Sequence, residues 1–272
     1  MSRALREDIG SGDVTARLIG AATQARAQVL CRDAAVLCGA PWFEETFRQL
    51  DPSVQVEWRA AEGAPIAAGT ILCELAGPAR ALLTGERTAL NFLQLLCATA
   101  TCAQRFVAAV AGTACRILDT RKTLPGLRSA QKYAVRCGGA CNHRQGLYDL
   151  VLIKENHIAA AGSIGAAIAT ARTASSGLRI EVEAEDLDQL RQAVEAHADV
   201  VLLDNFELEQ LRAAVAFNRA HLHPVLLECS GGVTLENVRR LAETGVDFIS
   251  VGALTKHVQA VDLSMRILAA RA

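Results

Sequence analysis

The hydrophobic pattern of the N-terminal part differs from that of the rest of the chain. From residue 25 to about residue 75, short strand-like runs are broken by glycine and proline, which is typical of a small, mostly antiparallel sheet. A long apolar helix is predicted over residues 84–112, with Thr84 as its N-cap and Glu86 in its first turn, where it favours the helix dipole. We therefore expect one domain over residues 1–112, formed by this sheet and helix.

From residue 113 onward, short apolar runs alternate with helix-like segments. The runs lie at residues 116–118, 150–153, 180–182, 200–203, 225–228 and 248–251. The helix-like segments lie at residues 128–137, 163–174, 186–197, 207–220 and 234–244. Strands that alternate with helices at this spacing predict right-handed βαβ units and a parallel sheet, and their two-sided apolar character indicates cover on both faces. The second domain is predicted over residues 113–272, with a C-terminal tail free to pack back on the first.

Polar residues or glycines close or directly follow all six runs. In an α/β barrel the carboxyl ends of the strands converge on one mouth, where substrates bind. Packing alone does not explain so many polar strand ends, so we interpret the domain as an incomplete (β/α) barrel with about six parallel strands. An open doubly wound sheet is the alternative. These strand ends are Asp119 to Lys122, Lys154 with Glu155, Glu183, Asp204 with Asn205, Glu228 with Ser230, and Gly252.

Positive charge is concentrated between Ile117 and His157. This segment has seven Lys or Arg residues and three acidic ones, a net charge of +4 in a chain whose net charge is −1. Such a local excess, without a basic arm or an aromatic stacking face, indicates an anionic small molecule rather than nucleic acid. Arginine forks and mobile lysine charges suit a ligand with several anionic groups. The cations that flank the first two strands are Arg121, Lys122, Arg144 and Lys154.

Two carboxylates, Glu183 and Asp204, end neighbouring strands on the same mouth. Carboxylates beside a phosphate ligand need a cation between them, and Mg²⁺ is bound by one or two carboxylates together with substrate phosphates. We therefore expect Glu183 and Asp204 to hold Mg²⁺, partly through water or substrate. The alternative is that they form structural ion pairs with Lys122 and Lys154.

Glycine-containing loops follow the fifth and sixth strands. Glycine lets backbone N–H groups approach a phosphate closely, and the loops after the last strands of a barrel are a common phosphate site. The loop residues predicted to bind phosphate are Ser230, Gly231, Gly232, Val251, Gly252 and Ala253.

Composition narrows the class of protein further. The chain is 51% apolar and 21% charged, and no run approaches the roughly 18 uncharged apolar residues of a membrane span. Its first residues lack an apolar signal core, and its nine cysteines form no CxxC motif, so we expect a cytoplasmic protein with free thiols. Cys137, Cys141 and His143 resemble a fragment of a zinc site, but no second ligand pair matches them, so zinc is not expected.

Long motifs in the chain resemble those of the quinolinate phosphoribosyltransferase family. The resemblance runs from about Ala4 to Met265 and implies a small N-terminal α/β sandwich joined to an incomplete α/β barrel. It also implies a reaction of quinolinate and phosphoribosyl pyrophosphate, with Mg²⁺, in NAD biosynthesis. One departure is Ala140, where the family often has a third glycine. The motifs are TGERTALNFLQ, DTRKTLPGLRSAQKYAVRCGG, NHRQGLYD, VLIKENHI, LLDNF, ECSGGVTLENVR and AETGVDFISVGALTKHVQAVDLSMR.

The resemblance implies a role for each matching residue. Lys122, Glu183 and Asp204 would be the catalytic residues on the ribose, pyrophosphate and Mg²⁺ side, and the two glycine loops would hold the 5′-phosphate. Arg87 would enter the site from the partner subunit of a homodimer, with a hexamer left open. The residues that would hold the carboxylates of quinolinate within one chain are Thr120, Arg121, His143, Arg144 and Lys154.

Three other functions remain as alternatives. A barrel enzyme could use Lys154 as a Schiff-base nucleophile, which requires a desolvated lysine. A paralogous group associated with molybdenum transport departs from the DTRKT and KENH motifs, which are intact here. The last alternative is a non-catalytic protein that binds anionic ligands.

Overall fold

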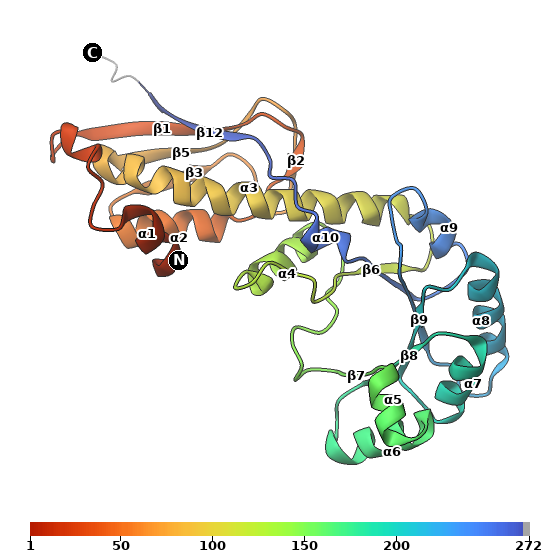
Figure 1. Ribbon diagram of the computed structural model, residues 1–272. Coiled ribbons are helices and arrows are strands. Elements are labelled where there is room, and N and C mark those ends of the chain that lie inside the picture. Colours follow the sequence, from red (N-terminus) through yellow and green to blue (C-terminus); the bar gives the residue numbers. More distant parts are fainter. Residues whose placement is uncertain (269–272) are drawn as a thin grey trace. The chain divides into compact units, whose positions relative to one another are not determined.

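The computed structural model describes residues 1–268 and shows two compact units (Figure 1). One unit consists of residues 1–102 together with the chain from residue 258 onward, and the other of residues 103–257. The division falls inside the long helix α3, Ala79–Ala109. Each unit has its own main sheet, antiparallel in the first and parallel in the second.

The first unit contains an antiparallel sheet in the order β12-β1-β5-β3. Alternate side chains of β1 are buried, among them Ala27, Val29 and Cys31, because successive residues of a strand point to opposite faces. The predicted small antiparallel sheet is therefore confirmed. Its elements are α1 (Ser2–Ile9), the 3₁₀ turn η1 (Ala16–Leu18), β1 (Gln24–Cys31), β2 (Ala35–Val36), α2 (Ala40–Leu50), β3 (Gln55–Trp58), β4 (Pro65–Ile66), β5 (Thr70–Pro78), α3 and β12 (Leu263–Leu268).

Helix α3 begins earlier than the sequence pattern predicts. It starts at Ala79, directly after the proline that ends β5, so the prediction of Thr84 as an N-cap is wrong. The Thr84 hydroxyl instead donates a hydrogen bond to Asp13 Oδ2 at 2.9 Å. The helix packs closely on α2, since a Cβ at Gly85 would lie 2.7 Å from the ring of Phe47.

Within the described chain, α3 is long and apolar enough to cross a membrane by length and composition alone. This differs from the expectation that no segment approaches that limit. Leu82, Leu90 and Leu93 of α3 are fully buried in the core of the first unit. Packing therefore accounts for the apolar character of the helix, as it does in core helices generally.

Helix α2 was not predicted from the sequence pattern. Phe43 and Phe47 are buried on its inner face, at the spacing of one helical turn. Its first backbone N–H groups are bound by a side chain remote in sequence, because Glu62 accepts from Gly39 N at 2.7 Å and from Ala40 N at 3.2 Å. A cap supplied from so far along the chain leaves no local sequence signal.

The second unit contains the parallel sheet, whose strands coincide closely with the predicted apolar runs. Four of the five predicted helices begin within one residue of their expected start, whereas α9 is shorter and α5 and α10 were not predicted. The strands are β6 (Arg116–Leu118), β7 (Val151–Ile153), β8 (Ile180–Ala184), β9 (Val200–Asp204), β10 (Leu226–Ser230) and β11 (Phe248–Ser250). The helices are α4 (Arg128–Cys137), α5 (Glu155–Ala161), α6 (Ile164–Ala174), α7 (Leu187–Glu195), α8 (Leu208–Ala220), α9 (Val238–Ala242) and α10 (Ala253–Lys256).

The strand order of this sheet is β6-β11-β10-β9-β8-β7. From β7 to β11 each strand pairs with its successor, and β11 then pairs with β6, the first strand of the unit. This is the cyclic order of a barrel, interrupted only between β6 and β7, and a doubly wound sheet would instead reverse its order at a switch point. The predicted incomplete barrel with about six parallel strands is therefore confirmed. Beside β6, Cys141 forms a single parallel bridge with Leu118.

Candidate active site

The strands of the parallel sheet carry two rows of side chains with different chemistry. One row is apolar and fully buried, as shown by Val182 of β8 and Val201 of β9. On the opposite face the register pairs Asp204 with Ser230. Glu183 pairs with Leu202, which points to the same face as Asp204 because it lies two residues before it. Glu183, Asp204 and Ser230 therefore share one face at the carboxyl ends of adjacent strands.

Lys154 and Glu183 form an ion pair across the ends of β7 and β8. Lys154 Nζ donates to Glu183 Oε2. The side chain of Lys154 is 46% exposed and that of Glu183 14% exposed, so the pair lies at the solvent boundary. Lys154 also precedes α5 as its N-cap, and its backbone N–H donates to His157 Nδ1 at 3.0 Å.

Asp204 lies at the end of the neighbouring strand, half-buried. Burial raises the pKa of Asp204, and the charge of Glu183 raises it further, while Lys154 and Lys122 oppose the shift. These four charged groups therefore act on one another electrostatically. The paired carboxylates offer oxygen ligands in a partly dry place, which is the donor set that Mg²⁺ prefers.

A cavity of about 520 Å³ lies at the ends of β6, β10 and β11. Lys122 crosses the Gly252 turn, where an added Cβ would lie 3.0 Å from Lys122 Cδ. Val251 does not line this cavity, and its N–H donates to Leu118 O at 2.9 Å within the sheet. The polar and glycine residues that line the cavity include Thr120, Lys122, Ser230, Gly231, Gly232, Gly252, Lys256 and His257, with Ala253 beside them.

Lys256 and His257 were not predicted as site residues. Both residues nevertheless come within five positions of Gly252. They lie at the C-terminal end of the short helix α10, and both line the same cavity. A cation and an imidazole beside glycine turns suit an anionic ligand.

The turn at Gly231 is determined by its contact with Asn205. Gly231 has φ +96° and Asn205 has φ +57°, both in the left-handed region. A Cβ at Gly231 would overlap the Asn205 side chain, 2.7 Å from its Cγ. Asn205 N donates to Ser230 O at 2.9 Å, and Asn205 Nδ2 donates to Asp204 Oδ2 at 2.9 Å. The glycine loop and the carboxylate are therefore positioned together.

Two guanidinium groups, those of Arg121 and Arg144, act on each other electrostatically. Burial lowers the pKa of Arg144, and the charge of Arg121 lowers it further, although Glu181 and Asp149 oppose the shift. Among the described residues, nothing hydrogen-bonds Arg121 Nε, which is buried. Like charges held together without a bonded acid are a favourable place for an anionic ligand.

His143 connects this pair to two buried carboxyl groups. His143 Nδ1 accepts the backbone N–H of Arg144 at 2.7 Å, so the ring proton lies on Nε2, which is 2.9 Å from Glu181 Oε2 and 3.7 Å from Glu228 Oε2. Glu181 and Glu228 are 1% and 2% exposed. Burial, and then the charge of Glu181, raise the pKa of Glu228 to about 8. Glu181 was not among the predicted site residues.

The predicted site residues fall into two groups in the structure. Those of the strand ends lie together in the second unit, as described above. Arg87 lies on α3 in the first unit, where it is exposed and is followed by the buried residues Thr88 to Leu90. Its predicted role concerns a partner subunit.

A barrel-ordered sheet with cations, carboxylates and glycine turns at its strand ends defines an α/β enzyme that binds an anionic small molecule. Two family profiles match the chain. The profile described as quinolinate phosphoribosyl transferase, N-terminal domain, matches residues 13–97, and the one described as its C-terminal domain matches residues 99–266. The chain belongs to the quinolinate phosphoribosyl transferase family.

Similar proteins cover both units. A Bacillus subtilis protein named probable nicotinate-nucleotide pyrophosphorylase (carboxylating) is 42% identical over 262 residues, covering 96% of this chain and 90% of that protein. The human nicotinate-nucleotide pyrophosphorylase (carboxylating) is 40% identical over 268 residues, covering 97% and 89%. A solved structure of the nicotinate-nucleotide pyrophosphorylase from Francisella tularensis has a TM-score of 0.93 at 44% identity, covering 98% and 94%. The expected family membership is confirmed, and the protein is an enzyme of this family.

Proposed function

We propose that the protein transfers the phosphoribosyl group of phosphoribosyl pyrophosphate to quinolinate. The products are nicotinate mononucleotide, pyrophosphate and carbon dioxide, a step of NAD biosynthesis. The observation that carries the proposal is the presence of the cations Arg121, Arg144 and Lys154 in the same unit as the glycine-lined cavity. A dicarboxylate and a sugar phosphate need these two kinds of site side by side.

Quinolinate is expected to bind on the cationic side. Arg121 and Arg144 supply forks that match a carboxylate, and Lys154 supplies a third charge at the end of β7. Thr120 lies directly before Arg121, and its Oγ1 accepts the Lys122 N–H at 3.0 Å. We expect His143 to act chiefly by fixing the Arg144 backbone, because both ring nitrogens face protein groups.

The 5′-phosphate of the sugar is expected in the glycine-lined cavity. Three of the residues that line it, Gly231, Gly232 and Gly252, have no side chain, so a phosphate can approach their backbone closely. Lys256 and His257 add positive or hydrogen-bonding groups at the same place. Lys122 lines this cavity and also acts electrostatically on Asp204, so we expect it to reach the pyrophosphate.

Glu183 and Asp204 are the residues proposed to hold Mg²⁺, directly or through water and substrate oxygens. When bound, Mg²⁺ neutralises the charge that develops on the departing pyrophosphate. The mutual effect of the two carboxylates on the pKa of Asp204 supports a cation between them. Their present partners are Lys154 and Asn205, so a ligand would compete with existing bonds.

The reaction requires orientation more than proton transfer. The bond from the ribosyl carbon to pyrophosphate breaks, and the ring nitrogen of quinolinate attacks that carbon, which makes the ring a pyridinium. The bond to the neighbouring carboxylate then breaks, carbon dioxide leaves, and its electron pair stays on the ring as an ylide that takes up a proton. Holding both substrates in line can contribute about 7–11 kcal/mol to the lowering of the barrier. The arginines and Lys122 supply that alignment.

The geometry does not favour Lys154 as a Schiff-base nucleophile. Such a lysine must be desolvated and uncharged before it attacks a carbonyl. Lys154 is instead ion-paired with Glu183, and nearly half of its side chain is exposed. A positioning role on an anionic substrate fits these contacts better.

The decisive experiment is an assay with quinolinate, phosphoribosyl pyrophosphate and Mg²⁺. We expect nicotinate mononucleotide and one carbon dioxide per turnover, with no product when any one component is omitted or when a chelator is added. A purified, folded protein that binds quinolinate but releases no carbon dioxide would leave only the binding function. We further propose a cytoplasmic homodimer in which Arg87 completes the partner's site.

A further inference from the structure

A buried ion pair between Lys132 and Asp119 lies next to both arginine-bearing loops. Lys132 of α4 is 1% exposed, and Asp119, which follows β6, is fully buried. Burial raises the pKa of Asp119 and lowers that of Lys132, because desolvation opposes both charges. A pair in such surroundings is stable only when its remaining hydrogen-bonding capacity is also satisfied.

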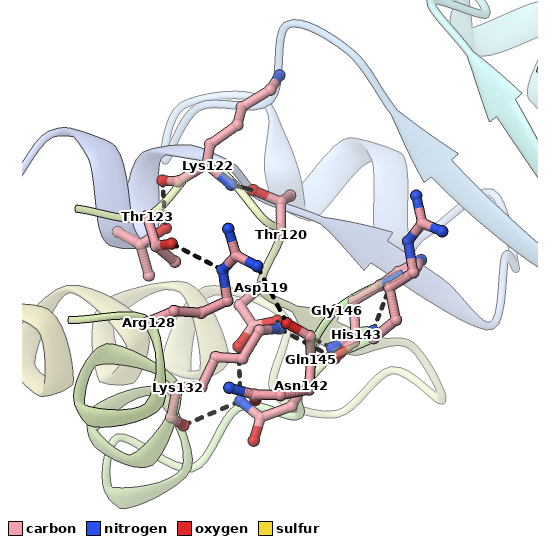
Figure 2. Close-up of polar contacts among 12 residues, drawn as sticks. Asp119, Thr120, Lys122, Thr123, Arg128, Lys132, Asn142, His143, Gln145 and Gly146 are labelled. Carbon is pink, nitrogen blue, oxygen red and sulfur yellow. Dashed lines mark hydrogen bonds and ion pairs between the residues drawn. The ribbon is translucent and has the colours of Figure 1, made fainter. Parts of the chain in front are cut away.

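The backbone of His143 completes this pair (Figure 2). Asp119 Oδ1 accepts from Lys132 Nζ and from the His143 N–H, the latter at 2.9 Å. Lys132 Nζ also donates to the His143 carbonyl at 2.9 Å. Asn142 Nδ2 donates to Asp119 Oδ2 at 2.6 Å and to the Lys132 carbonyl at 2.9 Å. The ion pair therefore binds both the backbone N–H and the backbone C=O of His143.

These contacts join two segments that carry the proposed quinolinate-binding cations. Asp119 precedes Arg121 by two residues, and His143 directly precedes Arg144. Residues 138–150 contain no helix and only the single bridge residue Cys141. Backbone hydrogen bonds hold Cys141 to the end of β6, and the side-chain bonds of Asp119 and Lys132 extend this connection to His143, directly before Arg144.

Apolar side chains at positions 119 and 132 could fill the same space but could not bind the backbone of His143. Buried ion pairs exchanged for well-packed apolar groups are often as stable or more stable. An apolar pair, however, would leave the N–H and C=O of His143 unbound in a buried place. The ion pair is thus better explained by the geometry it imposes than by the stability it adds.

We propose that Asp119 and Lys132 are positioning residues that set the spacing of Arg121 and Arg144 for the two carboxylates of the substrate. This inference rests on the proposed function and assigns these residues no contact with substrate. Figure 2 shows Lys122 pointing away from the pair. Loss of the pair should therefore disturb quinolinate binding much more than phosphoribosyl pyrophosphate binding.

The test compares Lys132→Met with the wild-type protein. We expect the KM for quinolinate to rise at least about tenfold, because small displacements of positioning groups have large effects on substrate alignment. The KM for phosphoribosyl pyrophosphate should change less than about twofold, since most of the glycine-lined cavity, including Ser230 to Gly232 and Gly252, lies on loops that Lys132 does not contact. Equal changes in both constants would contradict a positioning role.

A control removes a partly exposed ion pair remote from the strand carboxyl ends. Arg172 of α6 binds Asp199, which precedes β9, at 2.8 and 2.9 Å. Arg172→Ala should lower the melting temperature without changing either KM. If Arg172→Ala raises the quinolinate KM as Lys132→Met does, general loosening of the fold explains both, and the proposal is wrong.

A double variant, Asp119→Asn with Lys132→Met, separates stability from positioning. Removing both charges avoids an unpaired buried ion, so its melting temperature should exceed that of Lys132→Met. The quinolinate KM should remain raised, because the Lys132 bond to the His143 carbonyl is still absent. A double variant with wild-type quinolinate KM would overturn the proposal.

Hydrogen exchange in the wild-type protein tests the same point without a variant. The His143 amide should be as protected as the amides of the sheet, since it donates to a fully buried carboxylate. Rapid exchange of this amide would contradict the proposal. A wild-type protein that neither binds quinolinate nor forms nicotinate mononucleotide would instead contradict the proposed function. Protection of the His143 amide would then have no connection with substrate binding.

Discussion

Glu228 is the carboxyl group whose protonation this fold changes most clearly. Its ordinary pKa of 4.5 is raised to about 8, first by burial and then by the charge of Glu181. Between these pH values the folded protein keeps a proton that the unfolded chain has lost. The folded state therefore binds more protons, and the free energy of unfolding must decrease as pH rises from about 4.5 to about 8.

This linkage gives the first prediction. Glu228→Gln removes the titrating group, so its free energy of unfolding should vary less with pH across this range than that of the wild type. Urea denaturation at several pH values measures the difference. Glu195→Gln, at an exposed position of α7, is the control and should behave like the wild type. Parallel curves for wild type and Glu228→Gln would show that Glu228 does not hold this proton.

Replacement of Arg144 tests whether this residue binds quinolinate. Replacing it with alanine removes a fork whose charge-assisted bonds are worth about 1.5–3 kcal/mol, so the Kd for quinolinate should rise about 10- to 100-fold. Calorimetric titration of quinolinate into the variant measures this directly. Phosphoribosyl pyrophosphate should bind as before, and an unchanged quinolinate Kd would remove Arg144 from the pocket.

Single charged residues at strand ends could be identified from the sequence. Strands buried on both faces are mostly apolar, so a charged residue after the apolar run marks where each strand ends. Lys154, Glu183 and Asp204 lie at those ends in the structure. Glu228 was also identified near a strand end, but its proximity to Glu181 could not be predicted, since it depends on two strands, β8 and β10, that flank a third. The same holds for Lys132, whose partner Asp119 is thirteen residues away on another element.

At the scale of elements, the turn after β10 is the most constrained. Gly231 combines φ +96° with a close contact to Asn205, so Gly231→Ala must strain the backbone or displace that side chain. We expect a loss of about 1–3 kcal/mol in stability and a raised KM for phosphoribosyl pyrophosphate. Gly165→Ala is the control, because a Cβ there meets nothing within 4 Å inside α6. A fully active, stable Gly231→Ala protein would contradict this account of the loop.

Element boundaries were predictable where the signal was local. The Asp186 side chain accepts from Asp188 N and Gln189 N, so α7 begins one residue after its predicted start. Helix α2 depends on Glu62, and the start of α3 is set by the end of β5 rather than by Thr84. Long-range caps and continuous strand-to-helix junctions are therefore the features that a local pattern misses.

At the scale of the whole molecule, the proposed role of Arg87 requires two chains. Arg87→Ala and Glu183→Gln should each be nearly inactive alone. Mixed dimers, however, would contain one site with both residues intact. Refolding the two variants together should restore about one quarter of wild-type activity, because half of the dimers are mixed and each has one good site. Sedimentation analysis checks that dimers form, and no recovery in mixed dimers would place Arg87 outside the partner's site.

The last strand of the chain lies in the first unit. Strand β12 pairs with β1 from Arg26 with Leu268 to Cys31 with Leu263, so the N-terminal sheet takes its edge from the C-terminal end. During synthesis, this sheet cannot acquire that edge until the ribosome has made the chain as far as Leu268. A stalled or prematurely ended chain would therefore expose an unpaired β1, the kind of edge on which polypeptides aggregate.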